Sequence, residues 1–266
     1  IRRIHMRKYL LHVLIISFLV VIVSGCLTSG YKQFYNPYVD AKTLPDVQLL
    51  VEGQEPQVFG TDDFDRDIRI WESKQYFPIG DSYFNGPFEN IKNAVAQAKQ
   101  IGATIVLVGY QYTDTQTNTT TLFFPDNKTT YHSGISGNML YNSVTTTSGT
   151  TAVPFTTTYR RYDQRAVYFA KSTQKLKLGV RLEDLTPDQR EQIERNTGAV
   201  ISVVIEDTPA FYANVLGGDV LIEIDGQLVK NAEQALALVK DIPHEKTSTT
   251  LTVIRNSSEK EIEVKF

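Results

Sequence analysis

A nearly all-apolar run at residues 103–110 (ATIVLVGY) constrains the fold most strongly. Such a strand must be covered on both faces, which is typical of a strand inside a sheet that carries helices on either side. Residues 88–100 have apolar side chains at helical spacing, and Gly102 is suited to end that helix. The pattern of residues 76–84 predicts a strand that precedes this helix. The order predicts a strand–helix–strand unit within an α+β fold class.

Further strand patterns extend this unit into an N-terminal α/β domain of unknown function, which we place at residues 46–172. Residues 47–51 are mostly apolar, and residues 67–72 alternate apolar and charged side chains, so both segments predict strands. Residues 159–170 return to a strand pattern and close the domain.

Residues 113–158 differ in composition from the rest of this domain. They contain sixteen threonines and only three charged side chains, Asp114, Asp126 and Lys128. Threonine favours strands but is weakly hydrophobic. The segment therefore predicts a Thr-rich β insertion, either a long hairpin or a mobile insertion. An adhesive or ligand-binding surface segment is the alternative.

The N-terminus predicts an export signal. Four basic side chains precede an apolar run at residues 13–23, which is shorter than the ~20 residues that span a bilayer. The signal ends in Val23-Ser24-Gly25-Cys26, which resembles the lipobox of bacterial lipoproteins. In that family the cysteine is acylated and becomes the first residue. An ordinary signal peptide with a chance cysteine and an uncleaved anchor helix are the alternatives.

The lipobox resemblance has consequences for the rest of the chain. It implies a signal peptide at residues 1–25, a lipid-anchored tether at residues 26–45, and a covalent lipid on Cys26 with no other cofactor. Leu27 in the second mature position implies the outer membrane by the sorting rule of Gram-negative lipoproteins. Loss of the basic signal changes the net charge from −3 to −7, so we expect no nucleic-acid partner. The single cysteine also excludes an internal disulfide.

The C-terminal third contains short motifs in a fixed order. They are Leu178-Gly179-Val180, Gly198-Ala199-Val200, Asp207-Thr208-Pro209-Ala210, Gly218-Asp219-Val220 and Leu251-Thr252-Val253. In this order and spacing the chain resembles a PDZ domain of the kind attached to periplasmic HtrA/DegP-type proteases. The resemblance implies a PDZ domain at residues 173–266, built as a small β-barrel or sandwich with two helices.

Local signals in this third agree with that resemblance. Pro209 is placed to open a short helix, and Asp225-Gly226 is a strong two-residue hairpin signal. Asn231 is suited to cap the start of a helix that runs to about Lys240. Asp219 is expected as a turn or cap residue.

The resemblance also implies a peptide-binding site that works by β-augmentation. A partner segment would add a strand beside Leu178-Gly179-Val180, whose backbone amides would receive a terminal carboxylate. The implied site residues are Leu178, Gly179, Val180, Arg181, Leu182, Leu236 and Val239. The alternative for several of them is a place in the hydrophobic core.

The residues do not support the catalytic triad that HtrA-type proteases carry. His132 is the only histidine outside the signal and the C-terminal module. Gly80-Asp81-Ser82 begins like a chymotrypsin-type nucleophile motif but lacks the glycines that should follow. We therefore expect no catalytic residues. The acidic cluster at residues 62–65 lacks EF-hand spacing and is interpreted as a solvated turn, without a metal.

Together these features predict a lipid-anchored envelope adaptor or scaffold, or an accessory to a protease, facing the periplasm from the outer membrane. Its partners would be peptide C-termini or extended segments of envelope proteins. One alternative is an enzyme with a regulatory PDZ domain and a site near Asp81, Ser82 and Arg160 or Arg161. Another is a surface-exposed structural or adhesive lipoprotein.

Overall fold

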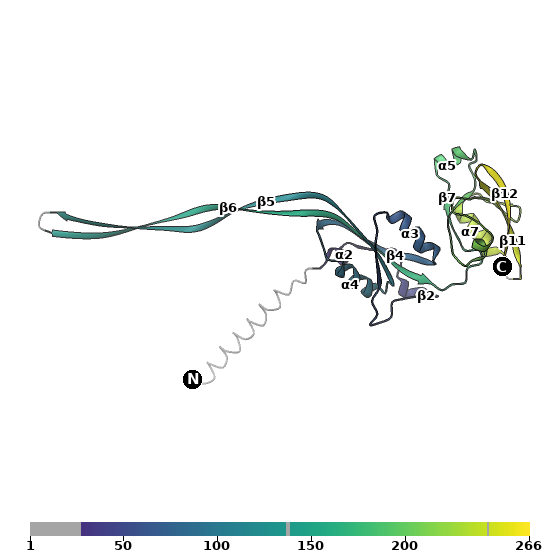
Figure 1. The fold of residues 1–266 in the computed structure, drawn as a ribbon, viewed down its shortest axis with the longest axis horizontal. Coiled ribbons are helices and arrows are strands. Elements are labelled where there is room, and N and C mark those ends of the chain that lie inside the picture. The colour runs from purple at the N-terminus through teal and green to yellow at the C-terminus, as the bar shows by residue number, and fades with distance from the viewer. Residues whose placement is uncertain (1–27, 137–138, 244) are drawn as a thin grey trace, which may run out of the picture. The chain divides into compact units, whose positions relative to one another are not determined.

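A computed structural model describes residues 28–136, 139–243 and 245–266. It is a mixed α+β structure with two sheets and few helices (Figure 1). Residues 85–88 and 110–164 form one compact unit, the ribbon unit, and the remaining described residues form the main unit. The expected signal peptide and Cys26 lie outside the described residues. No helix within these described ranges is long and apolar enough to cross a membrane.

The first sheet has the strand order β1-β4-β6-β5-β3, and β2 pairs with β6. Its strands are β1 (Tyr35–Pro37), β2 (Val47–Gln48), β3 (Gln57–Gly60), β4 (Tyr76–Pro87), β5 (Ile105–Ser136) and β6 (Met139–Ser172). The helical elements between them are α2 (Gly30–Gln33), the 3-10 turn η1 (Ala41–Thr43), α3 (Phe64–Ser73) and α4 (Lys92–Ile101).

The start of β5 is buried on both faces, as its apolar sequence predicts. Ile105 and Leu107 join a core cluster with side chains from α3. Val106 and Val108 join a second cluster with side chains from α4. Figure 1 shows α3 and α4 on opposite sides of the sheet. The predicted strand–helix–strand unit is confirmed, and β5 runs parallel to β3 through this buried stretch.

Helix α3 replaces the strand predicted at residues 67–72, so that prediction is wrong. Asp63 caps the helix by accepting a hydrogen bond from the Arg66 amide at 3.0 Å. Phe64, Ile68 and Trp71 follow at spacings of four and three residues and pack on the buried strands. The apolar residues within 67–72 therefore belong to one face of a helix that already begins at Phe64.

Residues 30–43 are folded, which corrects the tether expected over residues 26–45. Strand β1 pairs with β4, and Tyr31 is only 2% exposed. The Tyr31 ring packs edge-on against Phe84, with 5.0 Å between ring centroids. These elements are three or four residues long, so their sequence contains no visible period.

Helix α4 begins at Lys92 instead of residue 88 and ends where the sequence predicts. Gly102 adopts a left-handed conformation with φ +81°, and its amide donates to the Ala98 carbonyl. Glycine reaches this conformation without the strain that a side chain adds.

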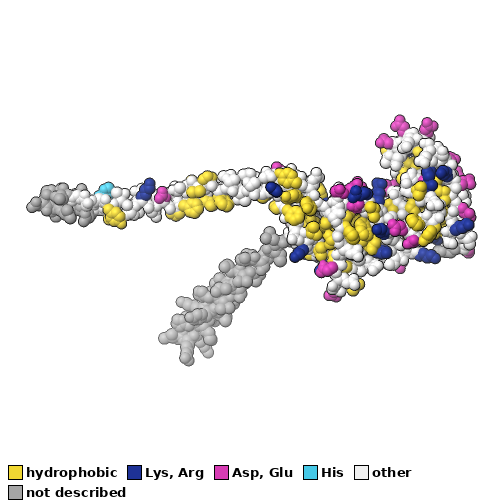
Figure 2. Space-filling view, in the orientation of Figure 1, with side chains coloured by type: hydrophobic (Ala, Val, Ile, Leu, Met, Phe, Trp, Pro, Cys, Tyr) yellow, Lys and Arg dark blue, Asp and Glu magenta, His cyan; other side chains and the backbone are white. Residues whose placement is uncertain are grey.

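The ribbon unit contains the long outer parts of β5 and β6. Threonine hydroxyls face each other across the strands in three pairs, with oxygens 3.1–3.5 Å apart: Thr117 with Thr158, Thr119 with Thr156, and Thr129 with Thr146. From one pair to the next, the residue number on β5 rises by as much as the residue number on β6 falls. The two strands are therefore antiparallel and keep one register. The predicted long hairpin is confirmed. Figure 2 shows apolar side chains and few charged ones along these strands.

The second sheet is open, with the order β12-β11-β9-β8-β7, and β10 pairs with β9. Its strands are β7 (Val180–Asp184), β8 (Ala199–Val204), β9 (Val220–Ile224), β10 (Gln227–Leu228), β11 (Ser248–Arg255) and β12 (Ser258–Lys265). Its helices are α5 (Pro187–Gln192), α6 (Pro209–Tyr212) and α7 (Ala232–Asp241). The expectation of a small barrel is corrected, because β12 and β7 stand at opposite ends of the pairing order.

Local signals in this sheet are confirmed. Asp225 and Gly226 have φ of 51° and 76° and join β9 to β10 as a two-residue turn. Pro209 lies in the first turn of α6. The Asn231 side chain caps α7 by accepting from the Gln234 amide at 2.9 Å.

Asp219 is a cap residue, as predicted, and also half of a buried ion pair. Its side chain is 2% exposed, accepts from the Leu216 amide at 2.9 Å, and receives two hydrogen bonds of 2.6 Å from Arg255. These bonds raise the pKa of the Arg255 guanidinium above its usual value. The pair ties the start of β9 to the end of β11.

Replacing Asp219 with alanine leaves the mostly buried Arg255 guanidinium without its counter-ion. We expect Asp219→Ala to lower the free energy of unfolding by about 3 kcal/mol in urea denaturation. Asp188→Ala, at an exposed carboxylate of α5, is the control and should cost less than about 1 kcal/mol. Equal losses in the two variants would contradict a structural role for the ion pair.

Candidate functional site

Strand β7 is the edge strand of the second sheet. It pairs with β8 on one side, and the strand order of the described chain ends there. Helix α7 lies beside β7 and runs in the opposite direction. Lys177, just before β7, donates to the carbonyl of Lys240 at the helix end, and Asp184, at the end of β7, accepts from the Ala232 amide at the helix start. The two elements form the walls of a groove.

Gly179 positions the loop at one end of this groove. Its φ is +83°, and a Cβ atom at this position would lie 2.2 Å from the Thr208 side chain. The carbonyls of Leu178 and Gly179 accept from the amides of Ala210 and Ile205 at 2.9 and 2.8 Å. Sequence and packing therefore both require glycine here.

The carbonyl groups of this loop accept hydrogen bonds, whereas two of its amide groups donate none to the described residues. Within the described ranges, neither the Leu178 amide nor the Gly179 amide donates a hydrogen bond. Unpaired buried donors are rare in folded proteins, because each costs free energy unless a partner arrives. Two adjacent amides of this kind can bind an anionic oxygen.

The structure brings all seven predicted site residues to one cavity of about 870 Å³. They are Leu178, Gly179, Val180, Arg181, Leu182, Leu236 and Val239. Their burial differs. Leu178 is 1% exposed and belongs to the hydrophobic core, whereas Leu236 is 44% exposed. Val180, Leu182 and Val239 are partly buried against the same core. Their role in peptide binding stays a prediction.

Part of the cavity wall comes from residues that sequence reasoning did not assign to it. Leu44, Pro45, Val47 and Phe77 belong to the first sheet or its connections, and residues 174–177 belong to the segment between the sheets. Only spatial proximity joins them to the groove, so no motif in the sequence indicates them.

The first sheet meets β7 and β8 through the end of α3. The Glu206 amide donates to the Ser73 carbonyl at 2.7 Å. Arg181 Nε lies 3.3 Å from Glu72 Oε1, an ion-pair distance without hydrogen-bond geometry. Burial raises the pKa of Glu72 above its usual value, against the opposing effect of Arg181.

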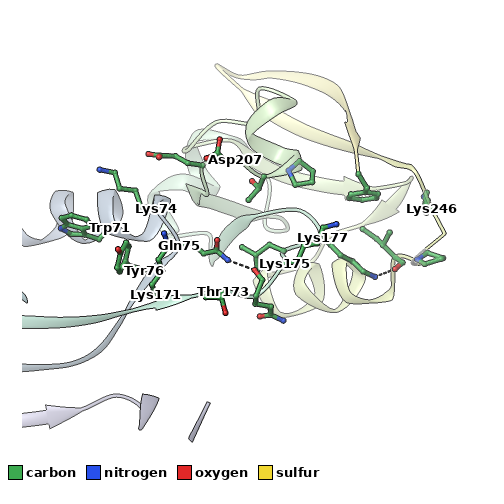
Figure 3. Close-up of a pocket in the computed structure, with 18 residues that line it drawn as sticks. Trp71, Lys74, Gln75, Tyr76, Lys171, Thr173, Lys175, Lys177, Asp207 and Lys246 are labelled. Carbon is green, nitrogen blue, oxygen red and sulfur yellow. Dashed lines mark hydrogen bonds between the residues drawn. The ribbon is translucent and has the colours of Figure 1, made fainter. Parts of the chain in front are cut away.

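A second cavity, of about 880 Å³, is also lined by residues 173–177 (Figure 3). Gln75 crosses toward this segment and donates to the Gln174 carbonyl at 2.6 Å. The lining of this second cavity includes five lysines from separate parts of the chain, together with Glu206 and Asp207. The lysines are Lys74, Lys171, Lys175, Lys177 and Lys246.

The residues considered for catalysis have structural partners. Ser82 is fully buried; its hydroxyl donates to the Tyr31 carbonyl at 2.6 Å and lies 3.2 Å from the Tyr168 hydroxyl. Burial raises the pKa of Tyr31 to about 12 and that of Tyr168 further still, so neither phenol serves as a base near neutral pH. His132 is exposed on the ribbon unit.

The remaining charged candidates also have local roles. Arg161 donates to the Asn85 side chain at 2.6 Å within the ribbon unit, and Asp81 lies 3.7 Å from Arg165. In the acidic cluster, Asp62 accepts from Arg66 and Asp63 caps α3. The described residues contain no group of three or more His, Cys, Asp or Glu side chains placed to hold a metal ion.

Comparison with known proteins identifies the module that carries the groove. Residues 177–266 match the PDZ domain family model. A probable periplasmic DegP-like serine endoprotease of Pseudomonas putida (strain W619) is 34% identical over 79 residues, 30% of this chain and 16% of that protein. Its Rickettsia prowazekii counterpart is 30% identical over 91 residues, 34% of this chain and 18% of that protein. The match therefore spans less than a fifth of either relative.

Some solved structures are also similar to part of this chain. The HtrA-type protease AlgW with decapeptide is 23% identical, with a TM-score of 0.31, over 37% of this chain and 36% of that one. The HtrA3 PDZ domain bound to a phage-derived ligand is 17% identical, with a TM-score of 0.29, over 33% of this chain and 81% of that one. The family model and the curated relatives, taken without the solved structures, show that the C-terminal part of the chain is a PDZ domain with homology to HtrA/DegP proteases.

The close approach at Gly179 predicts an unequal response to two glycine substitutions. Gly179→Ala adds backbone strain and a clash with Thr208, so we expect a loss of about 3 kcal/mol in the free energy of unfolding. Gly226→Ala has a similar φ of +76° with no atom within 4 Å of the added Cβ, so strain alone should cost about 1–2 kcal/mol. Urea denaturation measures both, and equal losses would refute the packing argument.

Proposed function

We propose that this protein is a lipid-anchored envelope adaptor whose PDZ domain captures peptide C-termini or extended segments of other envelope proteins. The amides of Leu178 and Gly179, which donate to no described residue, and the edge of β7, which pairs with no described strand, are the observation that carries this proposal. The protein itself has no catalytic role in this account, and it presents or scaffolds partners, among them substrates of a protease.

The groove supports binding by strand addition. A peptide that runs antiparallel to β7 gains main-chain hydrogen bonds along a strand of five residues. Its terminal carboxylate meets the amides of Leu178 and Gly179. Its last apolar side chain reaches the cavity beside Leu236, the groove side chain that is most exposed among the predicted apolar set.

A lipid on Cys26 would complement this weak, general mode of recognition. Several acyl chains hold a protein stably at a membrane, because each buried CH2 contributes ~0.8 kcal/mol. Confinement of the protein and its partners to one surface raises their effective concentration. The acidic body after signal removal has no need to attract anionic lipid, since the acyl chains supply the attachment.

Selection of peptides with the full chain tests this function. The probe is a phage-displayed library of random peptides with free C-termini. We expect enrichment of apolar C-terminal residues, and at least a tenfold loss of affinity for the selected peptides in Leu236→Asp, because a carboxylate in the cavity loses solvation.

Leu228→Asp is the matched control for this experiment. Leu228 is 57% exposed on β10, outside the groove cavity, so its replacement should leave affinity unchanged. Peptides that bind the Leu236→Asp chain as well as the unaltered chain would overturn groove binding.

A second candidate function is a structural contact role for the ribbon unit. A two-stranded ribbon is marginally stable alone in water. Its apolar side chains are widely exposed, including Leu122 at 42%, Phe124 at 52%, Val153 at 43% and Phe155 at 57%. In the constant register these four lie on one face, opposite the threonine pairs.

Sedimentation velocity of the full chain in detergent tests this second function as contact between ribbons of neighbouring copies. We expect oligomers for the unaltered chain and for Leu228→Asp, and monomers for the double variant Phe124→Asp/Phe155→Asp, because exposed apolar patches of this kind mark contact surfaces. A monomeric unaltered chain over the whole concentration range would rule out this role.

A further inference from the structure

The charged side chains that line the groove cavity all have one sign. Its lining contains Lys175, Lys177, Arg181 and Lys240, and no aspartate or glutamate. This is unusual in a chain with more acidic than basic side chains. Arg181 forms an ion pair with Glu72 of α3. Lys177 donates to the carbonyls of Lys240 and Ile242, which holds its charge at the end of α7.

Lys175 and Lys240 are the remaining cations at this end. Both are exposed, and neither forms an ion pair with another described residue. Figure 3 shows Lys175 and Lys177 on the segment that leads into β7. The positive end of the groove therefore coincides with the loop that carries the unpaired amides of Leu178 and Gly179.

Two carboxylates stand at the opposite ends of β7 and α7, outside the lining of the cavity. Asp184 ends β7, and its carboxylate accepts from the Ala232 amide at the start of α7. Glu233 lies in the first turn of the same helix. Both carboxylates are exposed, and the positive end of the α7 dipole favours their position. Because α7 runs antiparallel to β7, charges of opposite sign stand at the two ends of one groove.

We propose, on the basis of the proposed function, that this groove selects peptides by the order of their charges. The preferred ligand has acidic side chains in the two positions before an apolar C-terminal residue, and basic side chains four and five positions before it. The acidic and basic pairs of such a peptide are centred three residues apart, about 10 Å in an extended strand, which fits within the five residues of β7.

Charge order, and not net charge, is the distinguishing feature of this ligand. A peptide of the same composition with the order reversed brings lysines to Lys175 and Lys240, and carboxylates to Asp184 and Glu233. Every charge contact that favours the first peptide then opposes the second. Exposed pairs change affinity by small factors each, so several acting together produce a measurable preference.

Two peptides of identical composition test the proposal with the full chain. One is Gly-Tyr-Lys-Lys-Ser-Asp-Asp-Val, and the other is Gly-Tyr-Asp-Asp-Ser-Lys-Lys-Val, both with free C-termini and fluorescent labels at the N-terminus. We expect the first to bind about tenfold more tightly in 0.1 M salt. The preference should fall below about twofold in 1 M salt, where the screening length drops to about 3 Å.

Charge reversal in the protein assigns the preference to the groove. Lys175→Glu/Lys240→Glu should remove most of the preference, whereas Lys92→Glu/Lys260→Glu, the same change at exposed sites on α4 and β12, should preserve it. A third peptide, with Gln and Asn in place of the charged residues, should bind all three chains equally and shows that each groove is folded.

The outcomes separate this inference from the function on which it rests. Equal affinity for the two charged peptides, with binding that Leu236→Asp abolishes, overturns charge-order selection and leaves the groove function intact. A preference that survives Lys175→Glu/Lys240→Glu also overturns it. Failure of all three peptides to bind the unaltered chain counts against both proposals.

Discussion

The close contact between Gly179 and Thr208 is the constraint on which the candidate site depends. Because the backbone at Gly179 has positive φ and no side chain, the loop can press against Thr208 while its carbonyls bond to the segment that leads into α6. In this arrangement the amides of Leu178 and Gly179 donate no hydrogen bond within the described part of the chain. Leu178 is anchored in the core at the same time, so the two donors are held on a rigid base. The groove beside β7 follows from the geometry of this loop.

Electrostatics give the groove its direction. The Lys177 ammonium group satisfies carbonyls at the end of α7, and Asp184 satisfies an amide at its start, so both helix ends receive the charge that their dipole favours. The contact of α3 with β8 and the Glu72–Arg181 pair place a second charged contact beside β7. Arg181 is thereby matched, which leaves Lys175 and Lys240 as the cations that a ligand can meet.

Much of this organisation is visible in the sequence, because the relevant signals are local. The run at residues 103–110, the Gly102 cap, the Asp225-Gly226 turn and the Asn231 cap each depend on a few adjacent residues. Other features depend on distant ones. In helix α3, apolar and charged side chains alternate over a short stretch, which resembles a strand. Strand β1 is too short to show a period. Leu44 and Phe77 join the groove only through tertiary packing. The turn at Asn256 and Ser257, with φ of 52° and 59°, lacks the glycine that usually indicates it.

Amide resonances of the loop give the most direct test of the account. In a 15N-labelled chain, titration with Gly-Tyr-Lys-Lys-Ser-Asp-Asp-Val should shift the amide protons of Leu178 and Gly179 downfield, as expected for new hydrogen bonds to a carboxylate. The same peptide with an amidated C-terminus should leave those two resonances in place. Shifts of equal size with both peptides, or shifts confined to the first sheet, would contradict the claim that these amides receive a terminal carboxylate.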